Sequence, residues 1–300
     1  MMQVYHNPVL LNESVEGLNI VEDGVYVDVT FGGGGHSRAI LDRLGPNGKL
    51  VAFDQDQDAL TNVIEDDRFL LINENFRYIK RFLRFNGVTA VDGILADFGV
   101  SSHQFDVAER GFSTRFEADL DMRMDQTNQR SAYDVINTYE EERLKQVFLQ
   151  YGELRQAPVM ARLIVQERET KPIKTSSHLK SVLVKFLKHK NEHKVLAQIY
   201  QAIRIEVNEE IDALKELLLQ TAELIKPGGR LSVISYHSLE DRLVKRFIRN
   251  GLFEGEPERD VFGNFEVPFK KVGQLIVPTK DEINENNRAR SAKLRIAIKV

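Results

Sequence analysis

The sequence predicts an α/β protein with a Rossmann-like, mostly parallel sheet that is interrupted by a helical insertion. Short apolar runs alternate with helical patterns over the first hundred residues, strand candidates almost vanish between Phe105 and Arg204, and the alternation then resumes. Strands that alternate with helices form right-handed βαβ units, which build a parallel sheet. We therefore expect a main domain from residues 1–104 and 206–300, with an inserted helical domain at 105–205.

The first third of the chain contains four strand candidates with helical patterns between them. The expected strands are residues 25–30, 50–53, 69–73 and 93–98, and the expected helices are 38–44, 58–64 and 79–85. A run of four glycines, Gly32–Gly35, follows the first strand, and Gly45-Pro46 ends the helix after it. Asp54 and Asp97 stand at the ends of the second and fourth strands.

The insertion and the last third have their own patterns. Helices are expected at 140–150, 157–169 and 179–188. One helix face is predicted from five apolar residues at spacings of three, four or seven, namely Val207, Ile211, Leu214, Leu218 and Ile225. A buried strand at 231–236 and a helix striped by Leu239, Leu243 and Phe247 follow. Residues 269–277 and 294–300 are expected to close the sheet, the last strand running antiparallel.

Composition and charge limit the class of protein. The chain has no cysteine and a net charge of −4, so disulfides and cysteine-bound metals are excluded, as is a protein that coats nucleic acid by charge alone. Residues 1–100 carry 8 basic and 15 acidic side chains, whereas residues 226–300 carry 15 basic and 10 acidic ones. Ordinary solvated helix faces produce such an asymmetry, and so do basic segments that meet a polyanion. Without a signal peptide or membrane-spanning run, we expect a cytoplasmic globular protein with no membrane partner.

The glycine run and Asp54 together predict an adenosyl cofactor. Glycines allow close approach of the backbone to a ligand at the N-terminus of the following helix. A carboxylate at the end of the second strand accepts the hydroxyls of an adenosine ribose. The dinucleotide fingerprint requires Gly or Ala at its last position, but the two possible registers place Ser37 or Arg38 there. NAD therefore fits less well, although these features alone permit both NAD and S-adenosylmethionine.

Two apparent metal motifs are rejected, and no metal site is expected. Asp54, Asp56, Asp58 and Glu65 match a calcium loop in spacing, but Ala59 stands where that loop needs glycine. His189 and His193 are four residues apart, as zinc ligands on a helix are, but they lie in a lysine-rich stretch with no third ligand in view.

Two further segments favour S-adenosylmethionine and suggest catalytic residues. Asp97 follows the fourth strand, at the edge where ligands bind in an open parallel sheet, although a helix N-cap role is also open. The turn Lys226-Pro227-Gly228-Gly229 is common before the fifth strand of S-adenosylmethionine methyltransferases. His237 is expected to face the same cleft, although a histidine there equally suits a structural hydrogen bond.

Taken in order, these motifs resemble the ribosomal RNA small-subunit methyltransferase H family, also called MraW, over essentially the whole chain. Shared segments include His6–Val9, Thr30–Ser37, Asp97–Ser102 and Glu109–Ser113, and the rest are Asp121–Asp125, Tyr151–Glu153, Gln201–Asn208, Lys226–Arg242 and Arg288–Arg295. The resemblance implies the class I S-adenosylmethionine methyltransferase fold with an inserted helical domain. It also implies N4-methylation of a cytidine in the decoding centre of 16S ribosomal RNA. The small ribosomal subunit is the expected partner, although the sequence does not decide between naked RNA and the assembled subunit as substrate. Tyr236 and Tyr200 each stand where the family often has Phe.

The resemblance further implies the site residues. Cofactor contacts are expected from Gly34, Gly35, His36, Asp54, Phe76, Asp97 and Gln104. The residues themselves already indicate the glycine loop, Asp54 and Asp97, whereas Phe76 and Gln104 come from the resemblance alone. RNA is expected to meet the insertion and the basic helix near residue 245, through Arg115, Arg123, Arg204, Arg242 and Arg246.

For the reaction, Asp97 is the first candidate to accept hydrogen bonds from the N4 hydrogens of the target base, and the backbone of 98–102 is the second. His237 is the other catalytic candidate. Two rival functions stay open: an NAD-dependent oxidoreductase, and a non-catalytic RNA-binding or assembly factor that keeps the fold. The sequence does not determine the oligomeric state.

Overall fold

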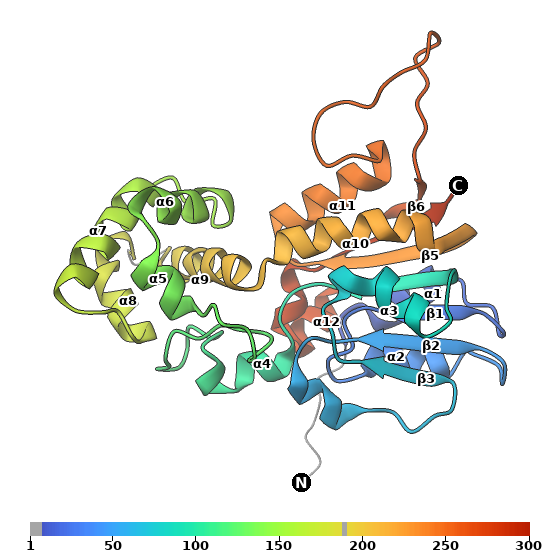
Figure 1. Ribbon diagram of the computed structural model, residues 1–300, viewed down its shortest axis with the longest axis horizontal. Coiled ribbons are helices and arrows are strands. Elements are labelled where there is room, and N and C mark those ends of the chain that lie inside the picture. The colour runs from blue at the N-terminus through green and yellow to red at the C-terminus, as the bar shows by residue number, and fades with distance from the viewer. Residues whose placement is uncertain (1–7, 188–190) are drawn as a thin grey trace. The chain divides into compact units, whose positions relative to one another are not determined.

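The structure of the protein is a computed structural model that describes residues 8–187 and 191–300. The predicted motif residues His6 and Asn7, and His189 of the rejected zinc pair, lie outside the described residues. The chain folds into two compact units, one that ends at Gly99 and resumes at Ile211, and one from Val100 to Glu210 (Figure 1). The second unit is five residues longer at each end than the insertion predicted at 105–205, because α4 and the whole of α9 belong to it.

The first unit is built on a seven-stranded sheet in the order β3-β2-β1-β4-β5-β7-β6. The strands are β1 (Val25–Asp28), β2 (Lys49–Phe53), β3 (Phe69–Ile72), β4 (Val91–Asp97), β5 (Ile225–Ser235), β6 (Phe269–Ile276) and β7 (Lys293–Lys299). Strands β1 to β5 pair in parallel, whereas β7 runs antiparallel to both β5 and β6. The mostly parallel sheet and its antiparallel last strand are thus confirmed. The strand order reverses at β1 and β4, which makes their carboxyl ends the switch point where ligands bind.

Helices cover both faces of this sheet. Val27 and Val51 point to the face packed by α3 (Ile79–Phe85), α10 (Glu210–Leu224) and α11 (Ser238–Asn250). Tyr26 and Leu50, one residue earlier on the same strands, point to the face packed by α1 (Leu11–Gly17) and α2 (Gly35–Leu41). Side chains of a strand alternate between the two faces, so β1 and β2 read as continuous apolar runs. The remaining elements of this unit are η1 (Gln57–Asn62), η2 (Phe76–Tyr78), α12 (Lys280–Glu285) and η5 (Asn287–Ser291).

The second unit is helical and has its own apolar core. Its elements are α4 (Ser102–Asp106), η3 (Ala108–Arg110), α5 (Ala132–Thr138), α6 (Glu141–Gln150), α7 (Ala157–Thr170), α8 (Ser176–Val182), η4 (Val184–Phe186) and α9 (Glu192–Asn208). Buried side chains from α5 to α9, such as Ile136, Phe148 and Ile203, form one cluster. The side chain of Asn208 joins the end of α9 to the segment before α5, since its Oδ1 accepts the N–H of Met124 (2.7 Å) and its Nδ2 donates to the carbonyl of Met122 (2.8 Å).

Two predicted elements were wrong in detail. The apolar stripe from Val207 to Ile225 does not lie on one helix: α9 ends at Asn208, Glu209 adopts a left-handed conformation (φ 51°), and Ile225 already belongs to β5. Val207 instead packs in the helical unit, whereas Leu214 and Leu218 pack against the sheet. The helix predicted at 58–64 is the short 3-10 helix η1, whose first turn is capped by the Asp56 side chain.

Within the described parts of the chain, no helix is both long enough and apolar enough to cross a membrane.

Candidate active site

The candidate site lies where β1, β2 and β4 end, at the switch point of the sheet. Asp28 and Asp97 are the last residues of β1 and β4, and Asp54 directly follows β2. Three carboxyl groups are thus placed at one edge, around the loop that connects β1 to α2. Their burial raises the pKa of all three, and the charge of Asp28 contributes to the raised pKa of both others.

The glycine loop is shaped by its packing as well as by its backbone conformation. Gly34 is the N-cap residue of α2 and is left-handed (φ 76°), a conformation that glycine adopts at little cost. A Cβ on Gly34 would also lie 2.9 Å from the Phe31 ring. A Cβ on Gly35 would lie 2.1 Å from Cγ of Pro8, which leaves no room for any side chain. Both predicted glycines therefore have a steric reason to be glycine in the unliganded protein.

Asp54 is held against this loop. Its Oδ2 accepts the N–H of Gly32 (2.7 Å) and its Oδ1 accepts the N–H of Asp56 (2.9 Å). Asn62 donates to the Gly32 carbonyl (3.0 Å), which fixes the loop from the other side. Burial raises the pKa of Asp54 to about 6, against the lowering effect of these two N–H groups. Each carboxylate oxygen has more than one lone pair, so the ionised group is able to accept further hydrogen bonds from a ligand.

Asp28 is a site residue that the sequence prediction missed. It is fully buried, and it accepts hydrogen bonds from the Ser37 hydroxyl (2.7 Å) and from the backbone N–H of Thr30 (3.1 Å). The Thr30 hydroxyl in turn accepts the backbone N–H of Asp97 (2.7 Å). Asp28 therefore links the start of α2, the glycine loop and the end of β4. Its position at the end of β1, equivalent to that of Asp97 on β4, was a signal that could have identified it.

Asp97 combines partial exposure with an unsatisfied oxygen. Its side chain is 21% exposed, and its Oδ1 has no hydrogen-bond partner in residues 8–187 and 191–300 although that atom is itself buried. Burial raises the pKa of Asp97 to about 6, while the nearby His36 imidazole and a hydrogen bond from the Tyr236 hydroxyl lower it. A buried acceptor without a donor is costly, so this oxygen is suited to a hydrogen-bond donor supplied by a ligand.

His36 is oriented by the backbone. The Val9 carbonyl, which can only accept, lies 3.2 Å from Nε2, so this nitrogen carries a proton. The other nitrogen, Nδ1, then faces Asp97 with 4.0 Å to Oδ2, a distance for electrostatic attraction but too long for a hydrogen bond. His36 is buried in α2. These contacts make the imidazole a fixed neighbour of the Asp97 carboxylate.

Phe76 belongs to the first unit and Gln104 to the second. Phe76 begins η2 after β3, and its ring lies 5.7 Å from that of Phe98, centroid to centroid. Asn75 caps η2, and its amide donates to Gln55 (2.8 Å), so the loops after β2 and β3 are joined. Gln104 belongs to the helical unit, where it forms a capping box with Ser101 at the start of α4 and is buried.

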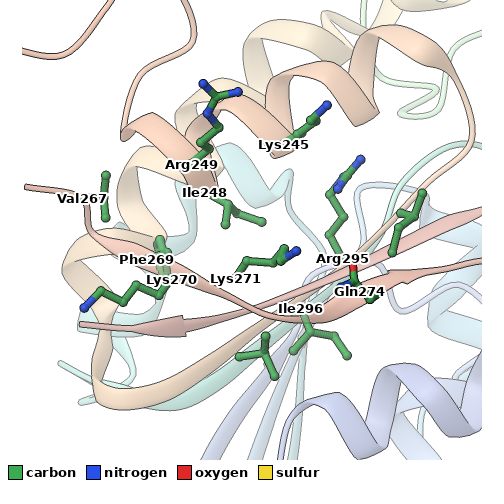
Figure 2. A pocket seen from close by; sticks show the side chains of 12 residues that line it. Lys245, Ile248, Arg249, Val267, Phe269, Lys270, Lys271, Gln274, Arg295 and Ile296 are labelled. Carbon is green, nitrogen blue, oxygen red and sulfur yellow. The ribbon is translucent and has the colours of Figure 1, made fainter.

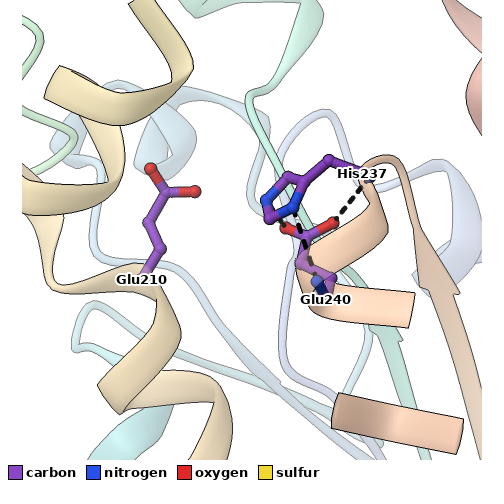
Figure 3. A group of neighbouring side chains, drawn as sticks. All are labelled: Glu210, His237 and Glu240. Atoms are coloured by element: carbon purple, nitrogen blue, oxygen red, sulfur yellow. Dashed lines mark hydrogen bonds and ion pairs between the residues drawn. The ribbon is translucent and has the colours of Figure 1, made fainter. Parts of the chain in front are cut away.

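At the end of β5, the chain turns into α11 through Tyr236 and His237. The Nδ1 of His237 accepts the N–H of Glu240 (3.4 Å), and His237 Nε2 lies 3.0 Å from Glu240 Oε1 (Figure 3). Glu240 also accepts the N–H of Tyr236 (2.9 Å), and it is buried. His237 is therefore the capping residue of α11, the structural alternative left open for it. Tyr236, which the sequence identified only as a departure from the family, contacts Asp97 and has a pKa raised well above its usual value by burial.

The five arginines predicted to meet RNA differ in their surroundings. Arg123 is bound by the Asp121 carboxylate (2.7 Å), and Arg204 by Glu210 (2.8 Å). Arg246 donates to the carbonyl of Gly255, whereas Arg115 and Arg242 are exposed. Ion-paired arginines are held in one geometry, and Arg123 and Arg204 each have a carboxylate partner within the helical unit.

Comparisons with known proteins match the entire chain. A family model described as the MraW methylase family matches residues 3–300. "Ribosomal RNA small subunit methyltransferase H" of Flavobacterium johnsoniae is 70% identical over 296 residues, which cover 99% of this chain and 98% of that protein. The protein of the same name from Christiangramia forsetii is 68% identical over 300 residues, covering 100% and 99%. The solved structure of an rRNA methylase from Streptococcus thermophilus is 13% identical, with a TM-score of 0.44, and covers 100% of this chain and 99% of that chain.

Proposed function

Because this chain belongs to the MraW methylase family, we propose that it methylates N4 of a cytidine in the decoding centre of 16S ribosomal RNA. The family and the full-length relatives make it an S-adenosylmethionine-dependent methyltransferase of small-subunit ribosomal RNA. The cytidine, its N4 atom and the decoding centre are the finer part of the proposal. The main structural support for this proposal is Oδ1 of Asp97, which is buried without a hydrogen-bond partner at the switch point of the sheet.

The described residues fit an adenosyl cofactor. Asp54 presents acceptor oxygens for ribose hydroxyls next to the backbone of the glycine loop, and we assign it that role together with Gly34, Gly35 and His36. Phe76 supplies an aromatic ring after β3 for packing against adenine. Gln104 stays a proposed contact from the start of the helical unit. The bound cofactor supplies an electrophilic methyl group on a sulfonium.

Asp97 has the chemistry to activate the acceptor. Cytosine N4 is a weak nucleophile because its lone pair is delocalised into the ring, and positive charge grows on it as the new bond forms. A carboxylate that accepts a hydrogen bond from an N4 hydrogen stabilises that charge more in the transition state than in the ground state. Asp97 is ionised above about pH 6, and its free oxygen needs a donor of this kind. The backbone of residues 98–102 is the second candidate for this role.

His237 has a different proposed part. Since its imidazole caps α11 and faces Glu240, we assign it to positioning the turn that carries Tyr236, and through Tyr236 the Asp97 carboxylate. For RNA, the proposed contacts are the arginines at 115, 123, 204, 242 and 246. Arg115 and Arg242, being exposed, are the first to test. The substrate is proposed to be the RNA within the small subunit, in the cytoplasm.

The experiment is mapping of the methylated nucleotide by mass spectrometry. Small subunits and protein-free 16S RNA from a strain that lacks this enzyme are incubated with the protein and S-adenosylmethionine, and nuclease fragments are sequenced. One methyl group on the exocyclic nitrogen of a decoding-centre cytidine is expected, with Asp97→Asn as the low-activity control. A methyl group on another atom or another base contradicts the proposal. Absence of any methyl transfer to either RNA would contradict the proposed substrate.

A further inference from the structure

A pocket of about 430 Å³ lies in the first unit, and its twelve lining residues include none of the three strand-end carboxyls. It is lined by α11 on one side and by the strands β6 and β7 on the other (Figure 2). Five of the lining residues are cationic, from all three elements: Lys245, Arg249, Lys270, Lys271 and Arg295. None of the twelve described lining residues is acidic. The pocket therefore has the electrostatic character of an anion-binding site.

Three of these cations are available to a ligand in the pocket. Arg295 is bound to Asp241 through its Nε (2.8 Å), and so is held in place. Lys245, Arg249 and Lys271 form no ion pair with any carboxylate of the described chain, and all three are exposed, whereas the side chain of Lys270 points to the other face of β6 (Figure 2). In Figure 2, Lys245 and Arg249 extend from α11 above the pocket, and Lys271 lies across it from the strand below. Uncompensated like charges close together repel, so a bound anion would stabilise this arrangement.

The pocket owes its opening to an irregularity of the sheet edge. β6 is the edge strand, and its register with β7 shifts between the pairs Val272↔Ile296 and Ile276↔Leu294. Residues 273–275 of β6 therefore stand opposite Arg295 alone. Gly273 has φ 64°, a left-handed conformation suited to such a bulge. Bulges at sheet edges redirect side chains and end the pairing, and here the bulge lets Gln274 and Leu275 line the pocket.

The interior of the pocket is apolar. Ile248 of α11 and Phe269 of β6 are buried on the face of the sheet that α11 packs against, and both line the pocket. The amide of Gln274 adds a group that both donates and accepts hydrogen bonds. An apolar interior with a cationic rim and one amide matches a ligand with a flat apolar body, polar edges and an anionic group. A nucleotide has these three parts.

We propose that this pocket binds one unstacked nucleotide of the substrate RNA, at a distance from the methylated base. The phosphate would contact Lys245, Arg249 or Lys271, and the base would enter against Ile248 and Phe269. The inference rests on the proposed function in that the substrate is RNA, and it adds a second anchoring point for that RNA. The volume of the pocket lies within the roughly 300–1,000 Å³ range of ligand pockets. The pocket therefore suits a small ligand group and not a continuous surface such as a membrane.

The geometry of α11 connects the two sites. This helix starts at Ser238, directly after the turn that carries Tyr236 and His237 at the candidate active site. At a rise of 1.5 Å per residue, Lys245 lies about 10 Å and Arg249 about 16 Å further along the helix axis. A rigid helix thus fixes the spacing between the reacting edge of the sheet and the pocket. RNA held at both points would have its target base placed at a fixed distance.

The test uses the full-length protein and a fluorescein-labelled, single-stranded RNA dodecamer of mixed sequence. The variant Arg249→Glu/Lys271→Glu reverses two pocket charges, one on α11 and one on β6. The matched control Arg43→Glu/Lys49→Glu makes the same charge change at exposed residues just after α2 and at the start of β2. We expect the pocket variant to weaken RNA binding about tenfold or more at 0.15 M salt, and to reduce the slope of log K against log salt by about 1 to 2. The control should bind within about twofold of the unaltered protein.

A second measurement does not depend on any variant. RNA that contains 4-thiouridine is crosslinked to the unaltered protein by light, and the peptides are identified by mass spectrometry. Crosslinks to residues 245–249 or 267–275 support the pocket. Equal RNA affinities for the pocket and control variants, together with no crosslink in these segments, overturn it. Preferential binding to vesicles with 30% anionic lipid, lost in the pocket variant while RNA binding is kept, also overturns it in favour of a membrane.

These outcomes are separable from those of the proposed function. The dodecamer reports RNA binding without methylation, and the nucleotide map reports methylation without the pocket. A cytidine N4 product with equal RNA affinities refutes the pocket alone. Pocket-dependent RNA binding with a methyl group on another base refutes the nucleotide assignment alone. S-adenosylmethionine affinity, measured by calorimetry, should be the same in the pocket variant and the unaltered protein.

Discussion

Replacement of Asp97 by asparagine should make the unliganded protein more stable. Burial raises the pKa of this carboxyl from 3.8 to about 6, so the folded state carries its charge at a cost. Each pKa unit corresponds to 1.36 kcal/mol, and the shift is therefore worth about 3 kcal/mol when the group is ionised in both states. Since the folded-state pKa is the higher one, stability falls as pH rises from about 4 to about 6 and stays low above that. Asparagine has nearly the same shape and no charge.

The predicted gain depends on pH, which distinguishes it from a general effect on packing. Urea unfolding without cofactor should show Asp97→Asn more stable by about 3 kcal/mol at pH 8 but only by about 1 kcal/mol at pH 4.5. Asp241→Asn is the opposite control, because Arg295 and Lys293 hold the pKa of Asp241 below its usual value. Loss of the Asp241 charge in this variant should destabilise the protein at pH 8. Equal stability of Asp97→Asn and the unaltered protein at both pH values would refute the argument from burial.

The same variant tests the chemistry. If the Asp97 carboxylate accepts a hydrogen bond from the reacting amine, its loss should lower the turnover number by about a hundredfold or more. Methyl transfer to small subunits measures the turnover, and calorimetry measures the affinity for S-adenosylmethionine. Full turnover with weakened cofactor binding would show that Asp97 is a cofactor ligand and not a catalytic residue. If Asp97→Asn is more stable than the unaltered protein but nearly inactive, the Asp97 charge serves the reaction and not the stability of the fold.

Three further predictions concern single groups. Burial raises the pKa of Asp54 to about 6, and ribose hydroxyls need its ionised form. The affinity for S-adenosylmethionine, measured by calorimetry, should therefore be about tenfold weaker at pH 5 than at pH 8. Equal affinities at the two pH values would show that Asp54 does not bind the ribose. Tyr236→Phe deletes a hydroxyl that lowers the pKa of Asp97, so the acidic limb of the turnover–pH profile should move to higher pH, and an unmoved limb contradicts this coupling. Asn208→Ala removes the hydrogen bonds to the Met122 carbonyl and the Met124 N–H, and urea unfolding should show a loss of about 2 to 3 kcal/mol; a loss below about 0.5 kcal/mol would show that water replaces the amide.

The sequence was informative wherever local pattern and position on a strand decide the structure. Asp54 and Asp97 were recognisable because each ends an apolar run, and the parallel sheet brings strand ends to one edge. Asp28 satisfies the same criterion but was overlooked beside the more conspicuous glycines. Phe76 and Gln104 have no local signal of a ligand, and only the resemblance to a family suggested them.

Other features depend on tertiary contacts that spacing does not encode. The break at Glu209 is invisible in the apolar pattern, because Val207 and Ile211 are four residues apart and read as one helix face. The role of Tyr236 depends on where its hydroxyl reaches, and that is set by the packing of β4 against β5. The basic pocket likewise joins α11 to a bulge in β6, two segments whose residues are more than twenty positions apart.

The three strand-end carboxyls also have a consequence for the exchange of cofactor. Burial raises the pKa of Asp28, Asp54 and Asp97, and the charge of Asp28 adds to the raised pKa of the other two. Before transfer the proposed ligand carries a positive sulfonium, and after transfer its sulfur is neutral. Ionised carboxyls attract the positive sulfonium but not the neutral sulfur of the product, since Coulomb attraction requires a charge on each partner. We therefore expect these carboxyls to bind the charged cofactor more tightly than its neutral product.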